Sequence, residues 1–231
     1  MRRIVLLTVA CLVLASPAQA VPDAGTESPF ALGAGARDLA LGGASWASGD
    51  IATAAYWNAS RLARAEHLSL GGFHARLFDS DVLYNYLGAA IPTLDYGTFG
   101  LGIFRLGVNG IERRDASNLL LDEFSDRRLG FHLAYAIAAG KYDLGVAAAF
   151  EHHTLADYSA TSSPGVTLSA TRVFEPAAHW LQTAAFAVNL RNVLQPGAKL
   201  ADESVKDRSA LEVATSIRLI PSRNLPHALT L

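Results

Sequence analysis

Cysteine is almost absent from this chain of 231 residues. The single cysteine, Cys11, lies in a stretch with the form of a secretory signal peptide: a basic start (MRR), an apolar run over residues 4–15 and the small-residue tail SPAQA over 16–20. Residues 1–20 are therefore predicted to be a signal peptide that is removed. The predicted mature chain has no thiol, which excludes disulfides, thiol nucleophiles and cysteine-bound metals.

Long apolar runs and a charge excess are also missing. Beyond residue 20 no window approaches the ~20 apolar residues that a transmembrane helix needs, although hydrophobic residues make up 51% of the chain. The formal net charge of −2 argues against binding to nucleic acid. An exported, apolar chain of this kind is either a soluble periplasmic domain or a transmembrane β-barrel.

Alternation along the chain favours the barrel. Residues 128–138 (RLGFHLAYAIA) place large apolar side chains on one face and Gly, Ala and His132 on the other. A soluble sandwich would carry charges on its exposed face, whereas small uncharged residues suit the wall of a lumen. Eight segments follow this pattern, most of them near the ~9–11 residues that cross a bilayer as a strand: 67–77, 82–91, 99–108, 128–138, 143–151, 167–173, 182–192 and 210–219. The sequence predicts an all-β fold, an antiparallel transmembrane β-barrel.

The connections between these segments alternate in length. Those at 92–97, 138–143 and 175–179 are short, whereas those at 110–126, 153–165 and 195–209 are longer and more polar; only the short turn at 78–81 breaks the rule. Short turns at one end and long loops at the other are typical of outer-membrane barrels. We therefore expect an outer-membrane location, with the long connections outside the cell.

Two blocks before the first strand carry a family resemblance. GAGARDLALGGA (33–44) and AAYWNASRLA (54–63) resemble the N-terminal blocks of the PorV/PorQ family of FadL-like outer-membrane barrels. The matching residues are Gly35, Ala36, Arg37, Gly42, Gly43, Ala44, Tyr56, Trp57, Asn58, Leu62 and Ala63. Leu41 replaces the usual Met. At Ala59, Ser60 and Arg61 the family usually has Pro, Ala and Gly, and we expect this departure to loosen the turn after Asn58.

The resemblance implies that residues 21–66 fold into the lumen as a plug and that residues 67–231 form the barrel. Small residues suit a plug, because glycine turns sharply at little steric cost. The residues implied in gating or ligand passage are Gly35, Arg37, Gly42, Gly43, Tyr56, Trp57 and Asn58. The implied function is the handling or transport of hydrophobic compounds; the alternative is a shuttle that binds proteins of a type IX secretion system.

Three histidines are candidates for chemistry. His132 and Arg128 belong to the lumen-facing set, where a water-facing histidine is the simplest interpretation and an outer-membrane lipid hydrolase is a remote third function. His152 and His153 point to opposite faces of a strand, so they cannot chelate a metal together. No catalytic residue, metal or cofactor is predicted. The residues Tyr84, Tyr86, Tyr96, Tyr142 and Trp180 are expected to form an aromatic girdle at the membrane boundary.

The end of the sequence suggests an incomplete barrel. After a turn at 220–227, residues 228–231 (ALTL) begin a ninth strand. The family's barrels have about fourteen strands, an even number as in other bacterial single-chain barrels. We expect a barrel of about eight or nine strands that does not close. Its expected partners are membrane lipid, hydrophobic small molecules or secretion-system proteins.

Overall fold

A computed structural model describes residues 28–77, 81–175, 181–200, 203–206 and 209–219 of the chain. The predicted signal peptide (1–20), Trp180 and the predicted ninth strand (228–231) lie outside these residues. Within them no helix is long and apolar enough to cross a membrane.

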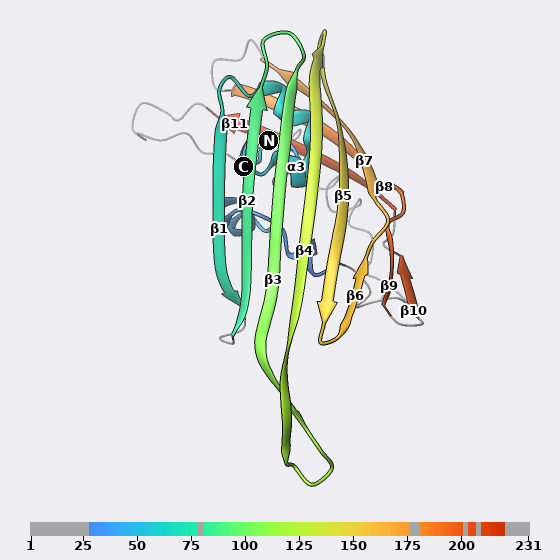
Figure 1. The fold of residues 1–231 in the computed structure, drawn as a ribbon. Coiled ribbons are helices and arrows are strands. Elements are labelled where there is room, and N and C mark those ends of the chain that lie inside the picture. Colours follow the sequence, from blue (N-terminus) through green and yellow to red (C-terminus); the bar gives the residue numbers. More distant parts are fainter. Residues whose placement is uncertain (1–27, 78–80, 176–180, 201–202, 207–208, 220–231) are drawn as a thin grey trace, which may run out of the picture.

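The fold is all-β, as predicted, and consists mainly of one curved antiparallel sheet (Figure 1). Each of the eight predicted segments is a strand, and each pairs with the next in sequence order. The strands are β1 (Ser69–Leu77), β2 (Val82–Pro92), β3 (Thr98–Arg114), β4 (Leu120–Ala139), β5 (Tyr142–Leu155), β7 (Gly165–Phe174), β8 (Leu181–Leu194) and β11 (Ala210–Leu219).

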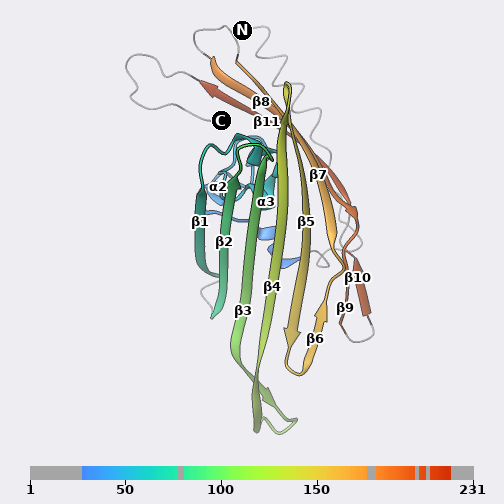
Figure 2. The same ribbon diagram turned by 45° about the horizontal axis from the view of Figure 1, so that its top comes forward.

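The sheet is open in the part of the chain that the structure describes. β1 and β11 are its two edges, and they do not pair with each other. The strands curl around a compact N-terminal region of short helices (Figures 1 and 2). The antiparallel meander is confirmed, and the expectation that these strands do not close by themselves agrees with this open arrangement.

The two faces of the sheet differ as the alternation predicts. On β4, Leu133 and Ile137 are 55% and 39% exposed on the outer face, whereas Ala136 on the inner face is fully buried. Large exposed apolar side chains recur on the outer face of each of these eight strands: Leu70, Leu87, Ile91, Phe99, Leu133, Ile137, Leu144, Val146, Leu168, Phe174, Phe186, Leu190, Leu211, Val213 and Ile217. Soluble monomers rarely expose apolar patches larger than a few hundred Å², so exposed apolar side chains that recur across eight neighbouring strands are unusual for a soluble monomer.

The three predicted long loops contain strands instead. Residues 110–126 mostly extend β3 and β4 into a tall hairpin that projects beyond the neighbouring strands (Figure 1). The ladder is interrupted between Val108 and Ile111, where Gly110 has a left-handed φ of 68°, and then resumes. β6 (Tyr158–Thr161) pairs back onto β5, and β9 (Gly197–Leu200) pairs with β10 (Glu203–Lys206). The sequence did not predict these strands because their composition is polar. An exposed hairpin has no buried face, so it needs no alternating apolar residues.

Residues 28–66, hereafter the inner segment, pack against the inner face of the sheet. They form η1 (Pro29–Leu32), α2 (Ala36–Ala40), α3 (Ala54–Trp57) and η2 (Ala59–Arg64). One buried cluster joins Leu62 and the alanines of α3 to Ala90, Ala134, Ala136 and Ala147 of the wall; a second joins Phe30 to Tyr84, Tyr86 and Phe104. The inner segment lies nearer the end of the sheet with the short turns (Figure 2).

Glycines on the inner face let the inner segment approach the wall backbone. A Cβ added at Gly145 would lie 2.3 Å from the amide nitrogen of Ser60, and one added at Gly88 would lie 2.0 Å from the carbonyl oxygen of Ala52. At Gly130 the added atom would lie 2.8 Å from the ring of Phe30. The atoms that a Cβ would meet belong to the backbone or to a buried ring. They cannot move aside without disturbing the packing, so a larger residue at these positions would cost stability.

We predict that Gly145→Ala separates η2 from β5 and destabilises the fold by about 1–3 kcal/mol, the usual cost of overpacking. The measurement is the thermal unfolding midpoint of the purified protein in detergent. Gly72→Ala is the matched control, because Gly72 is exposed and its added Cβ would meet nothing closer than 3.9 Å. Equal midpoints for the two variants would contradict the close packing of η2 on β5.

Candidate functional site

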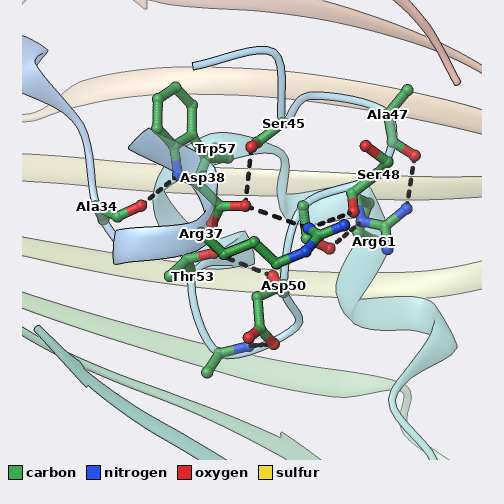
Figure 3. A network of polar contacts seen from close by, with 12 residues as sticks. Ala34, Arg37, Asp38, Ser45, Ala47, Ser48, Asp50, Thr53, Trp57 and Arg61 are labelled. Atoms are coloured by element: carbon green, nitrogen blue, oxygen red, sulfur yellow. Dashed lines mark hydrogen bonds and ion pairs between the residues drawn. The ribbon is translucent and has the colours of Figure 1, made fainter. Parts of the chain in front are cut away.

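A buried carboxylate organises the inner segment. Asp38 is fully buried in α2 and accepts hydrogen bonds from Ser45 Oγ at 2.8 Å and from Thr53 Oγ1 at 2.6 Å (Figure 3). The Arg37 guanidinium lies 3.7 Å from the same carboxylate and also donates to the carbonyl of Ser48. Asp38 therefore ties together three turns of the segment that would otherwise have few apolar contacts.

The glycines of the first block supply backbone shapes that other residues rarely adopt. Gly35 precedes α2 with a φ of 85°, and Gly42 and Gly43 follow it with φ of 66° and 76°. After this reversal Trp57 packs beside Gly43 and donates its indole N–H to the carbonyl of Ala34 at 2.8 Å. The spacing of the glycines thus sets the path of the segment around Trp57.

Asn58 connects the inner segment to the wall. Its Nδ2 donates to the Trp46 carbonyl and, at 2.9 Å, to Thr171 Oγ1 on β7. Its Oδ1 accepts from both the amide and the hydroxyl of Ser60. The Ser60 hydroxyl lies 2.7 Å from Thr171 Oγ1, and the Ser60 amide donates to Ser169 Oγ at 2.9 Å.

The expectation that the departures after Asn58 loosen this turn is wrong. Ser60 supplies the hydroxyl that bridges Asn58 to Thr171. Arg61 donates to the carbonyl of Ala47 at 2.7 Å and to that of Gly49 at 3.1 Å, which holds the preceding loop (Figure 3). Side-chain hydrogen bonds thus stabilise the turn.

An ion pair holds the end of η2. Arg64 Nε lies 2.6 Å from Asp143 Oδ2 at the start of β5, and the Asp143 side chain is 1% exposed. Asn189 of β8 adds a weaker contact, because its Nδ2 donates to the Trp57 carbonyl at 3.3 Å. The segment is therefore fixed to β5, β7 and β8 by polar groups.

Two tyrosines assigned to the aromatic girdle belong to this interface instead. Tyr84 and Tyr86 of β2 are 1% and 3% exposed and face inward. Their hydroxyls donate to the carbonyls of Gly33 and Ala52 at 2.8 and 2.9 Å. Because both lie at inward positions of an alternating strand, the strand period could have revealed the correct side. Tyr96 and Tyr142 are exposed, as a boundary residue would be.

Aromatic rings and one cation meet where α3 faces β4 and β8. The Arg191 guanidinium lies 4.9 Å from the Trp46 ring centroid and 5.5 Å from that of Tyr56. Arg191 Nε is also 3.6 Å from Glu212 Oε1 on β11. Burial raises the pKa of the Tyr56 phenol, and Arg191 opposes this shift. Tyr56 therefore stays neutral and donates to the Phe30 carbonyl at 2.8 Å.

His132 and Arg128 face inward, as predicted, but they lie in different surroundings. The His132 ring packs edge-on against Tyr56 and Phe104, at 5.4 and 5.3 Å between centroids. The inner segment therefore packs against His132, which stays half-buried. Arg128 pairs in register with Leu106 and His153, further toward the tall hairpin and only partly buried.

The remaining histidines make separate contacts. His152 lies 2.9 Å from Thr161 Oγ1 and His153 lies 2.8 Å from Asp126 Oδ1, on opposite faces of β5. Among the described residues no three His, Cys, Asp or Glu side chains converge to hold a metal ion.

No protein-family model matches the chain. No curated protein matches it either. The site is therefore defined by its geometry: a polar and aromatic interface between a folded segment and the inner wall of a sheet. The predicted residues Gly35, Arg37, Gly42, Gly43, Tyr56, Trp57 and Asn58 all lie within this segment, and Tyr56 and Asn58 contact the wall directly.

The wall half of the interface was missed by the sequence reasoning. Ser169, Thr171, Asn189, Arg191 and Glu212 all occupy inward positions of predicted strands. Polar residues on an inner face that is otherwise small were a usable signal, because such groups need partners once they are covered.

We predict that Asn58→Ala frees the inner segment from β7 and lowers stability by about 1–3 kcal/mol, because buried partners of the amide lose their hydrogen bonds. Faster tryptic cleavage after Arg61 and Arg64 in the folded, detergent-solubilised protein is the expected result. Asn109→Ala, at an exposed position of β3, is the control. Identical cleavage rates in wild type and Asn58→Ala would refute the anchoring role.

Proposed function

We propose that this chain is an outer-membrane β-barrel protein that handles or transports hydrophobic compounds, with the inner segment as its plug. The observation that carries the proposal is the contrast between the two faces of the sheet. The outer face exposes large apolar side chains on β1 to β5, β7, β8 and β11. The inner face carries small and polar residues beside η2 and buried rings on β2 and β3, and residues 28–66 pack against it. Lipid is the solvent that such an exterior requires.

The position of the inner segment supports gating. Irregular backbone is tolerated at membrane depth only when it is buried in protein or faces water. Residues 28–66 meet this condition by packing on the inner face. In the proposed mechanism a ligand enters from the side of the long hairpins, the segment shifts, and the ligand leaves through the wall or the opposite end.

The resemblance to the PorV/PorQ family supports the same proposal at the level of individual residues. Gly35, Gly42 and Gly43 occupy the left-handed positions, and Asn58 anchors the segment to the wall. In a bilayer the edges β1 and β11 must also be paired, because each unsatisfied backbone group there costs several kcal/mol.

A protein-shuttle role is the second candidate, favoured by the β3–β4 hairpin. Its tip exposes Leu119, Leu120 and Leu121 at 66%, 46% and 59%. Because this hairpin projects past the rest of the sheet, its leucines are placed to contact another protein (Figure 1). Such a shuttle needs no movement of the inner segment.

We expect the mature protein to fractionate with the outer membrane and to resist extraction by high salt and by carbonate. The physical reason is that the apolar exterior would be buried in lipid, and high salt weakens ionic contacts but not this burial. Immunoblotting of the soluble and membrane fractions measures this. Recovery in the soluble periplasmic fraction would disprove the membrane proposal.

We predict that a disulfide between Ser60→Cys and Thr171→Cys locks the segment and blocks passage. The two hydroxyl oxygens are 2.7 Å apart, close enough for a bond of ~2.05 Å after small adjustment. Uptake of a fluorescent apolar dye by proteoliposomes should fall when the variant is oxidised and return on reduction. Each single cysteine variant is a control. Unchanged uptake in the oxidised form would reject gating by the segment and favour the shuttle.

A further inference from the structure

The apolar exterior becomes basic toward the end of the sheet that carries the tall hairpin. Arg76 of β1, Arg105 of β3 and Arg127 of β4 all point outward and are exposed. His74 and His152 lie on the same face. We call these five residues the basic belt. Their outward direction follows from their shared parity with the exposed apolar residues on the same strands.

Strand register brings the three arginines together. Arg76 pairs with Leu83, Leu83 with Gly107, and Gly107 with Arg127, so Arg76 and Arg127 lie in one row. Three strand spacings separate them by roughly 14 Å, and Arg105 lies between them about 7 Å along β3. Leu83 and Gly107 stand between them in this row, and a Cβ added at Gly107 would lie 3.6 Å from Arg127 Cγ, so the Arg127 side chain packs beside Gly107.

Within the strand ranges that surround the three arginines, no carboxylate of the described residues shares their face; exposed Asp81 before β2 and exposed Glu123 of the tall hairpin lie outside these ranges. The outward positions of β1, β2 and β5, of β3 over 98–107 and of β4 over 127–139 contain no Asp or Glu. Asp126 and Asp143 are on these strands but face inward, where they bind His153 and Arg64. Arg127 makes a long bond of 3.3 Å to the neutral Asn109, and His74 lies 2.7 Å from Asn85. Within these ranges the three arginines therefore have no carboxylate partner on their own face.

The belt lies at the height of a bilayer boundary. Along the strands, Phe99 precedes Arg105 by roughly 20 Å, and Ile137 lies about 33 Å from Arg127. Strand tilt shortens both lengths, and they bracket the apolar band of ~25 Å typical of outer-membrane barrels. Large side chains such as Leu87 fill the surface between. A lipid whose acyl chains lie on that surface would place its headgroup at the arginines.

We propose that the basic belt binds the phosphate groups of a diphosphorylated glycolipid of the lipid A type in the outer leaflet. This inference rests on the proposed membrane function. Arginine presents paired N–H donors that match phosphate oxygens, and bonds between ionised partners are the stronger ones. A headgroup with two phosphates also suits two or three arginines spaced roughly 7–14 Å apart.

The test compares two charge-matched triple variants of the full chain in detergent. The first replaces the belt (Arg76→Gln, Arg105→Gln and Arg127→Gln). The control replaces three arginines outside the belt (Arg113→Gln, Arg114→Gln and Arg172→Gln). Equilibrium binding of diphosphoryl lipid A should weaken by roughly tenfold or more in the first, the least expected from losing one charge-assisted hydrogen bond. The control should bind like wild type, and added salt should weaken wild-type binding.

Further arms identify the ligand and separate this inference from the membrane proposal. Dephosphorylated lipid A should bind no better to wild type than to the belt variant. If the triple variant folds poorly, the single variant Arg105→Gln replaces it, and its affinity for diphosphoryl lipid A should fall by an intermediate amount. Equal binding by both triple variants, or full competition by an equal concentration of inorganic phosphate, would overturn the belt. If either result is obtained and the wild-type protein still fractionates with the outer membrane, only the lipid-binding role of the belt is rejected. Recovery of the wild type as a soluble protein would overturn both proposals.

Discussion

The absence of side-chain bulk where α3 and η2 meet the inner wall is the constraint on which the rest of this structure depends. Leu62 and the backbone around Ser60 lie where side chains at Gly100 and Gly145 would otherwise stand. Because the inner segment comes this close to the wall, a backbone amide such as that of Ser60 can donate to a wall hydroxyl. These hydrogen bonds hold a segment that has few apolar side chains of its own. Along these strands, small inward residues alternate with large outward ones. The same alternation therefore makes room inside the sheet and creates its apolar exterior.

The strands could be predicted from the sequence because alternation is a local property. A period of two is visible in any run of ten residues, and all eight predicted strands of the main sheet are present. Hairpins outside the apolar exterior were missed, since 110–126 has no buried face to impose a pattern. Tyr84 and Tyr86 were misassigned because their chemistry suits a membrane boundary. Their burial depends on partners that lie more than thirty residues earlier in the chain.

The site was predictable only on one side. The glycines and Asn58 stand out because their conformations or caps are local, whereas the roles of Thr171 and Arg191 depend on which strands the curved sheet brings beside α3 and η2. Charges follow a similar division. Inward acids such as Asp143 are paired with the segment or the wall, whereas Arg76, Arg105 and Arg127 lie exposed on the outward face. Side-chain direction, more than overall composition, distinguishes the two chemical environments.

The Asn58 anchor also has a consequence for the order of assembly. Its bond to Thr171 spans 113 residues, and the bond from Asn189 to Trp57 spans 132. Contacts this distant in sequence form slowly, because the entropy of closing a long loop must be lost before the contact is gained. The first folded residues of the chain can therefore reach their final positions only after β7 and β8 have joined the sheet. Until then the N-terminal fold depends on contacts within the inner segment, among them those of Asp38 with its two hydroxyl partners and of Trp57 with Ala34.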